Sequence, residues 1–174
     1  MKTVDRAKSR PEIGHSTERL YEDRHMKQKR KTQAGQMVCQ RCCAVSMQKH
    51  WFVNSELAVQ IKENPLSRHV ICPGCQRVED QHFEGEVILK SPLLSEQRAM
   101  VWGTLYHAAA KGYLHNPLSQ IAGIHEKDDT IRILTTTCTL AERLGKAINK
   151  AFKGKLKITP SKDEKFVFVN WQRP

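Results

Sequence analysis

Cysteines are the residues of this chain whose type and spacing predict chemistry. Four of the six cysteines form two Cys-x-x-Cys pairs: Cys39 with Cys42, and Cys72 with Cys75. A tetrahedral zinc ion binds four thiolates at ~2.3 Å, and a Cys-x-x-Cys pair on a tight turn offers two of them. Pro73 and Gly74 favour such a turn. The sequence therefore predicts one structural zinc ion, whose four cysteine ligands leave no open position for water.

Other roles for these residues stay open at this point. Cys43 could replace Cys42 as a ligand, although two intervening residues are the commoner spacing. A thioredoxin-like redox pair needs a cysteine at a helix N-terminus, and neither pair is followed by a pattern typical of a helix. Cys138 stands alone and is interpreted as a small buried apolar residue. A flanking histidine could also substitute as a ligand: His50, His69 or His82.

Motifs of known catalytic chemistry do not occur in the sequence. There is no H-E-x-x-H zinc motif, no G-x-S-x-G elbow, no P-loop and no G-x-G-x-x-G. Asp128 and Asp129 fall in a predicted turn, which explains them better than acid–base catalysis does. These observations predict a binding protein and not an enzyme.

The net charge is strongly positive and unevenly distributed. The chain has 174 residues, with 29 Lys and Arg against 18 Asp and Glu, a formal charge of +11. The excess lies in residues 1–36 and 91–174, whereas residues 37–90 are balanced. Such a charge, with a pI of about 9.6, is typical of proteins that bind polyanions, because phosphate contacts release counterions. Solubility alone is the other explanation.

Two groups of basic residues are the candidate nucleic-acid contacts. The first lies in residues 1–36, whose low apolar content predicts a disordered arm. The second follows one face of a helix predicted over residues 140–153 and extends into the next strand as one positive region; a solvated helix face is the alternative. The candidates are Lys27, Lys29, Arg30, Lys31, Arg143, Lys146, Lys150, Lys153, Lys155 and Lys157.

Base stacking is not predicted, because the aromatic side chains that can be assigned fit the hydrophobic core. Recognition of nucleic acid by shape and backbone is therefore expected. The aromatic residues assigned to the core are Trp102, Tyr106, Phe152 and Phe166.

The elements that position these residues are predicted from hydrophobic periodicity. A strand over residues 49–53, a helix over 55–63 and a strand over 68–71 separate the two cysteine pairs. The rest of the chain predicts the order βαββαββ, with the helices on one face of a mainly antiparallel sheet. The fold class is therefore α+β, in three parts: a disordered basic arm (1–36), a four-Cys zinc ribbon (37–85) and a βαββαββ domain (86–174).

Two long helices of this domain are predicted from their apolar faces. The first runs from Ser95 to about Lys111, and the second begins at a capping box from Thr139 to Glu142. The expected buried residues are Trp102, Leu105, Tyr106, Ala109 and Tyr113 in the first helix, and Leu140, Leu144, Ile148, Ala151 and Phe152 in the second.

Membrane insertion and secretion are not expected. No apolar run approaches the ~20 residues of a membrane helix, and the first ten residues contain no apolar segment of a secretory signal. A cytoplasmic protein is therefore predicted, in which cysteines bind metal more often than they form disulfides.

Three sequence motifs together resemble a known family. They are Cys39-x-x-Cys42, the run Cys72-Pro-x-Cys75-Gln-Arg-x-x-Asp80, and Thr135-Thr136-Thr137 leading into Leu140-Ala141-x-x-Leu144-Gly145. Over roughly residues 37–174 the chain is similar to bacterial proteins that resemble nonsense-mediated decay protein 3, the zinc-binding ribosome export adaptor of eukaryotes, which has archaeal relatives. The resemblance implies zinc binding by the four cysteines and association with the large ribosomal subunit. The larger relatives have more Cys-x-x-Cys pairs and export domains, so at most one zinc ion is expected here and the export function is not.

The predicted function is that of a non-enzymatic, zinc-binding and RNA-binding protein that associates with ribosomal RNA or a ribosomal subunit. No small-molecule substrate is evident. Three alternatives remain: a DNA-binding zinc-ribbon regulator, a protein-interaction module and a thiol redox protein.

Overall fold

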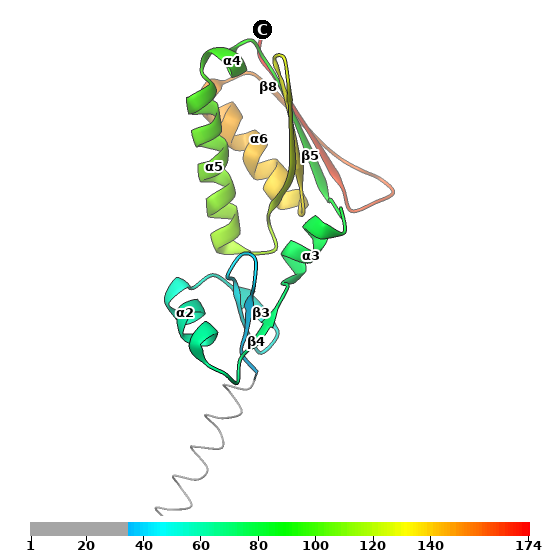
Figure 1. Ribbon diagram of the computed structural model, residues 1–174. Helices are drawn as coiled ribbons and strands as arrows, with labels where there is room; N and C mark the ends of the chain where they lie inside the picture. Colours follow the sequence, from blue (N-terminus) through cyan, green and yellow to red (C-terminus); the bar gives the residue numbers. More distant parts are fainter. Residues whose placement is uncertain (1–34) are drawn as a thin grey trace, which may run out of the picture.

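Residues 35–174 are described by the computed structural model and form a mixed α+β structure (Figure 1). This part of the chain contains two sheets, a four-stranded one with the order β3-β2-β1-β4 and a five-stranded one with the order β6-β7-β5-β9-β8. The predicted arm lies outside the described residues except for Gly35 and Gln36. Its four candidate contacts lie outside as well: Lys27, Lys29, Arg30 and Lys31.

The four-stranded sheet packs against one helix, α2 (Ser55–Glu63). Asn54 caps this helix by accepting a hydrogen bond from the Leu57 amide at 2.9 Å, which satisfies one of the free amides of the first turn. Ala58 and Ile61 are buried against the sheet. The strands are β1 (Met37–Cys39), β2 (Val45–Met47), β3 (His50–Phe52) and β4 (Arg68–Val70), with β4 parallel to β1 and the other pairs antiparallel. The predicted helix and the two predicted strands are confirmed here.

A short helix, α3 (Pro73–Glu79), follows the four-stranded sheet and was not predicted. Cys72 occupies its N-cap, and Pro73 takes the first helical position, where its missing amide hydrogen leaves no bond unmade. The helix has only seven residues and includes Gly74, a poor helix former. So short a segment does not show a helical period of apolar residues in the sequence. The prediction that neither cysteine pair is followed by a helix is therefore wrong.

The five-stranded sheet has β5 at its centre, antiparallel to β7 and parallel to β9. β6 and β8 are the edge strands, each paired antiparallel with its inner neighbour. The predicted element order βαββαββ is confirmed. The strands are β5 (Gly85–Lys90), β6 (Ile121–Lys127), β7 (Thr130–Thr135), β8 (Lys155–Pro160) and β9 (Val167–Gln172).

Helices α5 (Arg98–His115) and α6 (Cys138–Phe152) lie on the same side of this sheet (Figure 1). α6 contacts β5, β7, β8 and β9, and α5 packs beside α6. Along β5, β7 and β9, every second side chain is buried in this core. The side chains between them point to the other side of the sheet. The largest buried side chains include Leu89, Leu105, Ile131, Ile133, Leu140, Leu144, Ile148 and Trp171.

The boundaries of these two helices differ from the prediction. α5 begins at Arg98, after a separate short helix, α4 (Leu93–Glu96), and not at Ser95. α6 is capped by Thr137, whose hydroxyl accepts a hydrogen bond from the Leu140 amide at 3.4 Å, and not by Thr139. In α6 the cause is that Thr137 and Thr139 are equally good caps, and only the tertiary path of the chain selects between them. In α5 the N-cap is Gln97, which makes no capping hydrogen bond with its side chain, so no capping residue marks its start.

The predicted buried stripe of α5 is also partly wrong. Tyr106 is 58% exposed, and the buried positions are Val101, Leu105, Ala108 and Gly112. Apolar residues occur on several sides of α5, so their spacing did not single out the face that packs on α6. In α6, Ala151 is exposed and the other predicted core residues are buried: Leu140, Leu144, Ile148 and Phe152.

None of the helices in residues 35–174 has the length and apolar character to cross a membrane.

Candidate metal centre

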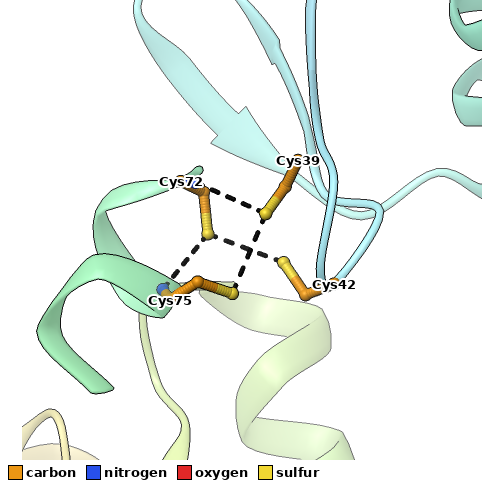
Figure 2. A group of neighbouring side chains, drawn as sticks. All are labelled: Cys39, Cys42, Cys72 and Cys75. Atoms are coloured by element: carbon orange, nitrogen blue, oxygen red, sulfur yellow. Dashed lines mark hydrogen bonds between the residues drawn. The ribbon is translucent and has the colours of Figure 1, made fainter. Parts of the chain in front are cut away.

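The two Cys-x-x-Cys pairs come together in space, with their sulfurs directed toward one another (Figure 2). The four Sγ atoms, of Cys39, Cys42, Cys72 and Cys75, all lie within 4.8 Å of one another. The Cys39 and Cys75 sulfurs are 3.8 Å apart, and the Cys42 and Cys72 sulfurs are 3.5 Å apart. Three of the residues are buried, and Cys42 is partly exposed. The arrangement offers a metal ion four sulfur ligands.

The first pair lies at the end of β1, which Cys39 closes, and in the tight connection to β2, which contains Cys42. The Cys39 amide donates to the Ala44 carbonyl at 2.8 Å, and the Cys43 amide donates to the Cys39 carbonyl at 3.1 Å. Cys43 has a φ of +59°, which turns the chain back toward β2. Its sulfur accepts a hydrogen bond from Lys62 Nζ at 3.1 Å and is not part of the cluster. The structure therefore brings Cys42, and not Cys43, to the other three sulfurs.

The second pair lies at the start of α3, where positions three apart share one side of the helix. The Cys75 amide donates to the Cys72 sulfur at 3.4 Å, and the Cys72 amide donates to the Cys39 sulfur at 3.4 Å. Amide hydrogens that point at sulfur favour its negatively charged form. The backbone around this pair is thus arranged to stabilise thiolates.

Two side chains of the five-stranded part complete the surroundings of the cluster. Gln120 lies with its Nε2 3.6 Å from the Cys75 sulfur, and the Tyr113 hydroxyl donates to the Cys42 carbonyl at 2.8 Å. Neither role was predicted. Tyr113 read as one position of an apolar stripe, and no local pattern connects residues so distant along the chain.

Helix α3 also joins the two parts of the molecule. Arg77 forms an ion pair with the buried Glu84 at 2.9 Å and donates to the Thr136 carbonyl at 3.0 Å. Gly74 lies so close to the connection before β6 that a Cβ atom on it would be 2.8 Å from the Pro117 carbonyl oxygen. The second cysteine pair is therefore held by contacts to the five-stranded part as well as by its own turn.

Close packing shifts the pKa values of these sulfurs in opposite directions. The hydrogen bond from Cys72 lowers the pKa of Cys42 to about 4, and the same contact, together with burial, raises the pKa of Cys72 above its ordinary value. Burial raises the pKa of Cys75 to about 11. Negative charges so close together and so far from water repel one another unless a cation neutralises them. The site therefore has the electrostatics of a cation-binding site.

The other candidate ligands lie outside the cluster. His50, His69 and His82 are all exposed. Cys138 is only partly buried, contrary to the prediction, and its thiol donates to the Glu84 carbonyl at 3.1 Å. Burial raises the pKa of this thiol, so its neutral form is favoured.

The predicted basic surface is divided by the five-stranded sheet. Lys155 and Lys157 alternate along β8 with Leu156 and Ile158, which pack on the core below the helices. Consecutive side chains of a strand point to opposite sides, so the two lysines face away from α6. The expectation that they extend the positive stripe of the helix is wrong. The helix side keeps Arg143, Lys146, Lys150 and Lys153, of which Lys146 pairs with Glu142 at 2.7 Å.

Comparisons with known proteins assign no family. No protein family, curated protein or solved structure matches the chain. The resemblance to the ribosome export adaptor family rests on the sequence motifs alone.

Proposed function

We propose that the protein binds one structural zinc ion and uses the scaffold that the ion stabilises to bind RNA. The observation that carries the metal assignment is the separation of the sulfurs. Four thiolates at ~2.3 Å from a tetrahedral zinc ion lie ~3.8 Å from one another, and the two sulfur pairs joined by hydrogen bonds are 3.8 Å and 3.5 Å apart. A ligand set of four cysteines is typical of structural zinc sites.

A non-enzymatic role fits the same ligand set. Four protein sulfurs complete a tetrahedral shell, so a bound zinc ion keeps no position for water or substrate. Within residues 35–174, the four cysteines are the only cluster of metal-binding side chains. We therefore assign the metal to folding and leave ligand binding to the surface.

The charge of the chain supports RNA as the ligand. The formal charge is +11, and exposed lysines lie on both sides of the five-stranded sheet. Each phosphate neutralised by a Lys or Arg releases a counterion, so this charge favours a polyanion. Ribosomal RNA or a ribosomal subunit is the form of this ligand that the family resemblance implies.

The first expected result is the metal content of the purified full-length chain. Elemental analysis should find one zinc ion per chain, and a strong chelator should remove it faster as the pH falls, because protons compete for the thiolates. A chain that contains no zinc when purified under reducing conditions would contradict the assignment.

The second expected result is binding to ribosomal particles that depends on salt. In a sucrose gradient at low salt the protein should migrate with a ribosomal subunit, and it should leave that fraction as salt rises. Absence from every ribosomal fraction at low salt removes the ribosome from the proposal. Preference for duplex DNA would favour a DNA-binding regulator, and binding that is insensitive to salt would favour a protein-interaction module.

A thiol redox protein is the second candidate, because Cys72 occupies the N-cap of α3, the place of a reactive cysteine in a redox pair. The sulfur–sulfur hydrogen bonds, however, join one pair to the other and not the members of a pair. A metal-free protein whose Cys72 and Cys75 are readily alkylated and form a disulfide would support this candidate.

A further inference from the structure

The side of the five-stranded sheet that faces away from α5 and α6 is covered by no helix in residues 35–174 (Figure 1). We call it the open face and define it by six side chains that the pairing register of the strands places on this side. They are Lys90, Lys127, Arg132, Lys155, Lys157 and Phe168. The surface is continuous across the five strands, because the strands are paired in register.

Positive charge dominates the open face. Its five basic side chains are exposed. Two carboxylates lie near them: Glu86 forms an ion pair with Arg132, and Asp129 lines a hollow together with Lys90 and Lys155. Lys90 and Lys155 occupy the same row of the sheet, since both pair with Gln172 of the strand between them. Because neighbouring strands are ~4.8 Å apart, the cations are spread over the face and can contact several phosphates along a chain.

An aromatic side chain lies exposed on the same face. Phe168 is 42% exposed, and its ring packs against that of Phe166 with the centroids 4.8 Å apart. The two residues are two positions apart along the chain and so share one side of it. Phe166 was predicted to lie in the core, and no stacking aromatic was expected. The structure places an exposed phenylalanine, Phe168, on the charged surface.

Hydrogen-bonding groups and a hollow lie beside the cations, whereas the register neighbours of Phe168 on this face are Glu86 and Thr159. A pocket of about 400 Å³ is lined by Lys90, Lys155 and Lys157 together with Ile88, Asn170 and Gln172. Side-chain amides can read the edge of a base, and ammonium groups can hold its phosphates. Phe168 precedes Asn170 by two positions on the same side of β9.

Charge limits what can cover this face. Residues 1–36 carry ten basic and five acidic side chains, so their net charge has the same sign as the face, and a second copy of the chain would present like charge to like charge. A partner with phosphates for the lysines and flat rings for Phe168 satisfies both features. Single strands display unstacked bases to aromatic side chains, whereas the bases of a duplex are stacked on one another.

We propose that the open face binds single-stranded RNA, with a base stacked on Phe168 and the backbone held by Lys155 and Lys157. This inference rests on the RNA-binding function proposed above and assigns it to one surface. Stacking on an aromatic side chain changes affinity about 5- to 150-fold per base. The affinity contributed by the lysine–phosphate contacts therefore depends on salt, whereas the affinity contributed by stacking on Phe168 does not.

The test measures the affinity of the full-length chain for a fluorescent oligouridine by anisotropy, over a series of salt concentrations. Lys155→Gln with Lys157→Gln should weaken binding and reduce the slope of log K against log salt by about 1.4, since each single-strand phosphate contact contributes about 0.7. Phe168→Leu should weaken binding at least fivefold with the slope unchanged, and Phe168→Trp should keep the affinity. Circular dichroism of each variant checks that it folds.

Matched charge changes separate the possible outcomes. Lys49→Gln with Lys111→Gln removes the same charge from exposed positions elsewhere, and a loss equal to that of the β8 pair would overturn the inference. A larger loss from Lys146→Gln with Lys150→Gln would move the site to α6 and leave the RNA-binding function intact. An unchanged affinity in Phe168→Leu also overturns the inference. A wild-type chain that binds no RNA at low salt contradicts the proposed function itself.

Discussion

Replacing Cys72 by serine should abolish zinc binding and unfold the four-stranded part of the molecule. The apolar core of this part has four buried members, Val38, Val45, Ala58 and Ile61, and so small a core rarely supplies more than ~3–5 kcal/mol. Structural zinc contributes about 10–16 kcal/mol in small metal-bound modules. The loss of one sulfur ligand therefore removes more free energy than the remaining contacts contribute.

Hydrogen exchange measured by mass spectrometry is the readout for this variant, together with elemental analysis for zinc. Amides of β1, β2 and α2 should lose their protection, whereas those of β5, β7 and β9 should keep most of theirs, because the five-stranded part has a separate and larger core. Protection of the segment around Tyr113 and Gln120 should fall in part, since both contact the cysteine cluster.

Cys43→Ser is the matched control for this prediction. Cys43 is the neighbour of Cys42 in sequence, and its sulfur accepts its hydrogen bond from Lys62 instead of joining the cluster. This variant should bind one zinc ion and keep the protection of the four-stranded part. If Cys43→Ser loses zinc and Cys72→Ser retains it, the ligand set described here is wrong.

The sequence was sufficient to identify the four sulfurs and the order of the strands and long helices in the five-stranded part. These features depend only on residues close together in the sequence. A Cys-x-x-Cys pair is complete within four residues, and the alternation of β8 and the helical period of α6 are each visible within one short segment. Features that depend on distant contacts were not predictable in the same way. Tyr113 and Gln120 reach the cysteines only after α5 has packed, and α3 is too short for a period.

The open face shows a second kind of limit. The alternation of β9 was visible in the sequence, with Val167, Val169 and Trp171 on one side and Phe168 and Asn170 on the other. Alternation does not say which residues of other strands share a side, because that depends on the pairing register. The prediction therefore grouped the two lysines of β8 with the basic residues of the preceding helix. In the structure they lie on the side of the sheet away from that helix, on the strand next to β9.

Replacing Gly145 of α6 by alanine should destabilise the five-stranded part, although alanine is the better helix former. Gly145 lies where α6 approaches the sheet most closely: a Cβ atom there would overlap the Cγ1 atom of Val169 and lie 3.2 Å from Leu156 Cδ1. Overpacking a core costs about 1–3 kcal/mol, against a gain in helix propensity of about 1 kcal/mol. We expect a net loss of up to about 2 kcal/mol for Gly145→Ala, and a loss of about 3 kcal/mol for Gly145→Val, whose side chain is larger and branched.

Gly103 of α5 provides the opposite case within the same domain. A Cβ atom on Gly103 would meet no atom within 4 Å, so Gly103→Ala should raise the free energy of unfolding by up to about 1 kcal/mol, through helix propensity alone. Urea denaturation followed by circular dichroism measures both substitutions under the same conditions. If the two Gly→Ala changes alter the free energy of unfolding in opposite directions, the effect of packing is separated from that of helix propensity. A stabilising Gly145→Ala would mean that α6 does not lie against β9 as closely as described. α6 covers the inner side of β5, β7, β8 and β9. The distance between α6 and β9 at Gly145 therefore also affects the stability of the strands that carry the open face.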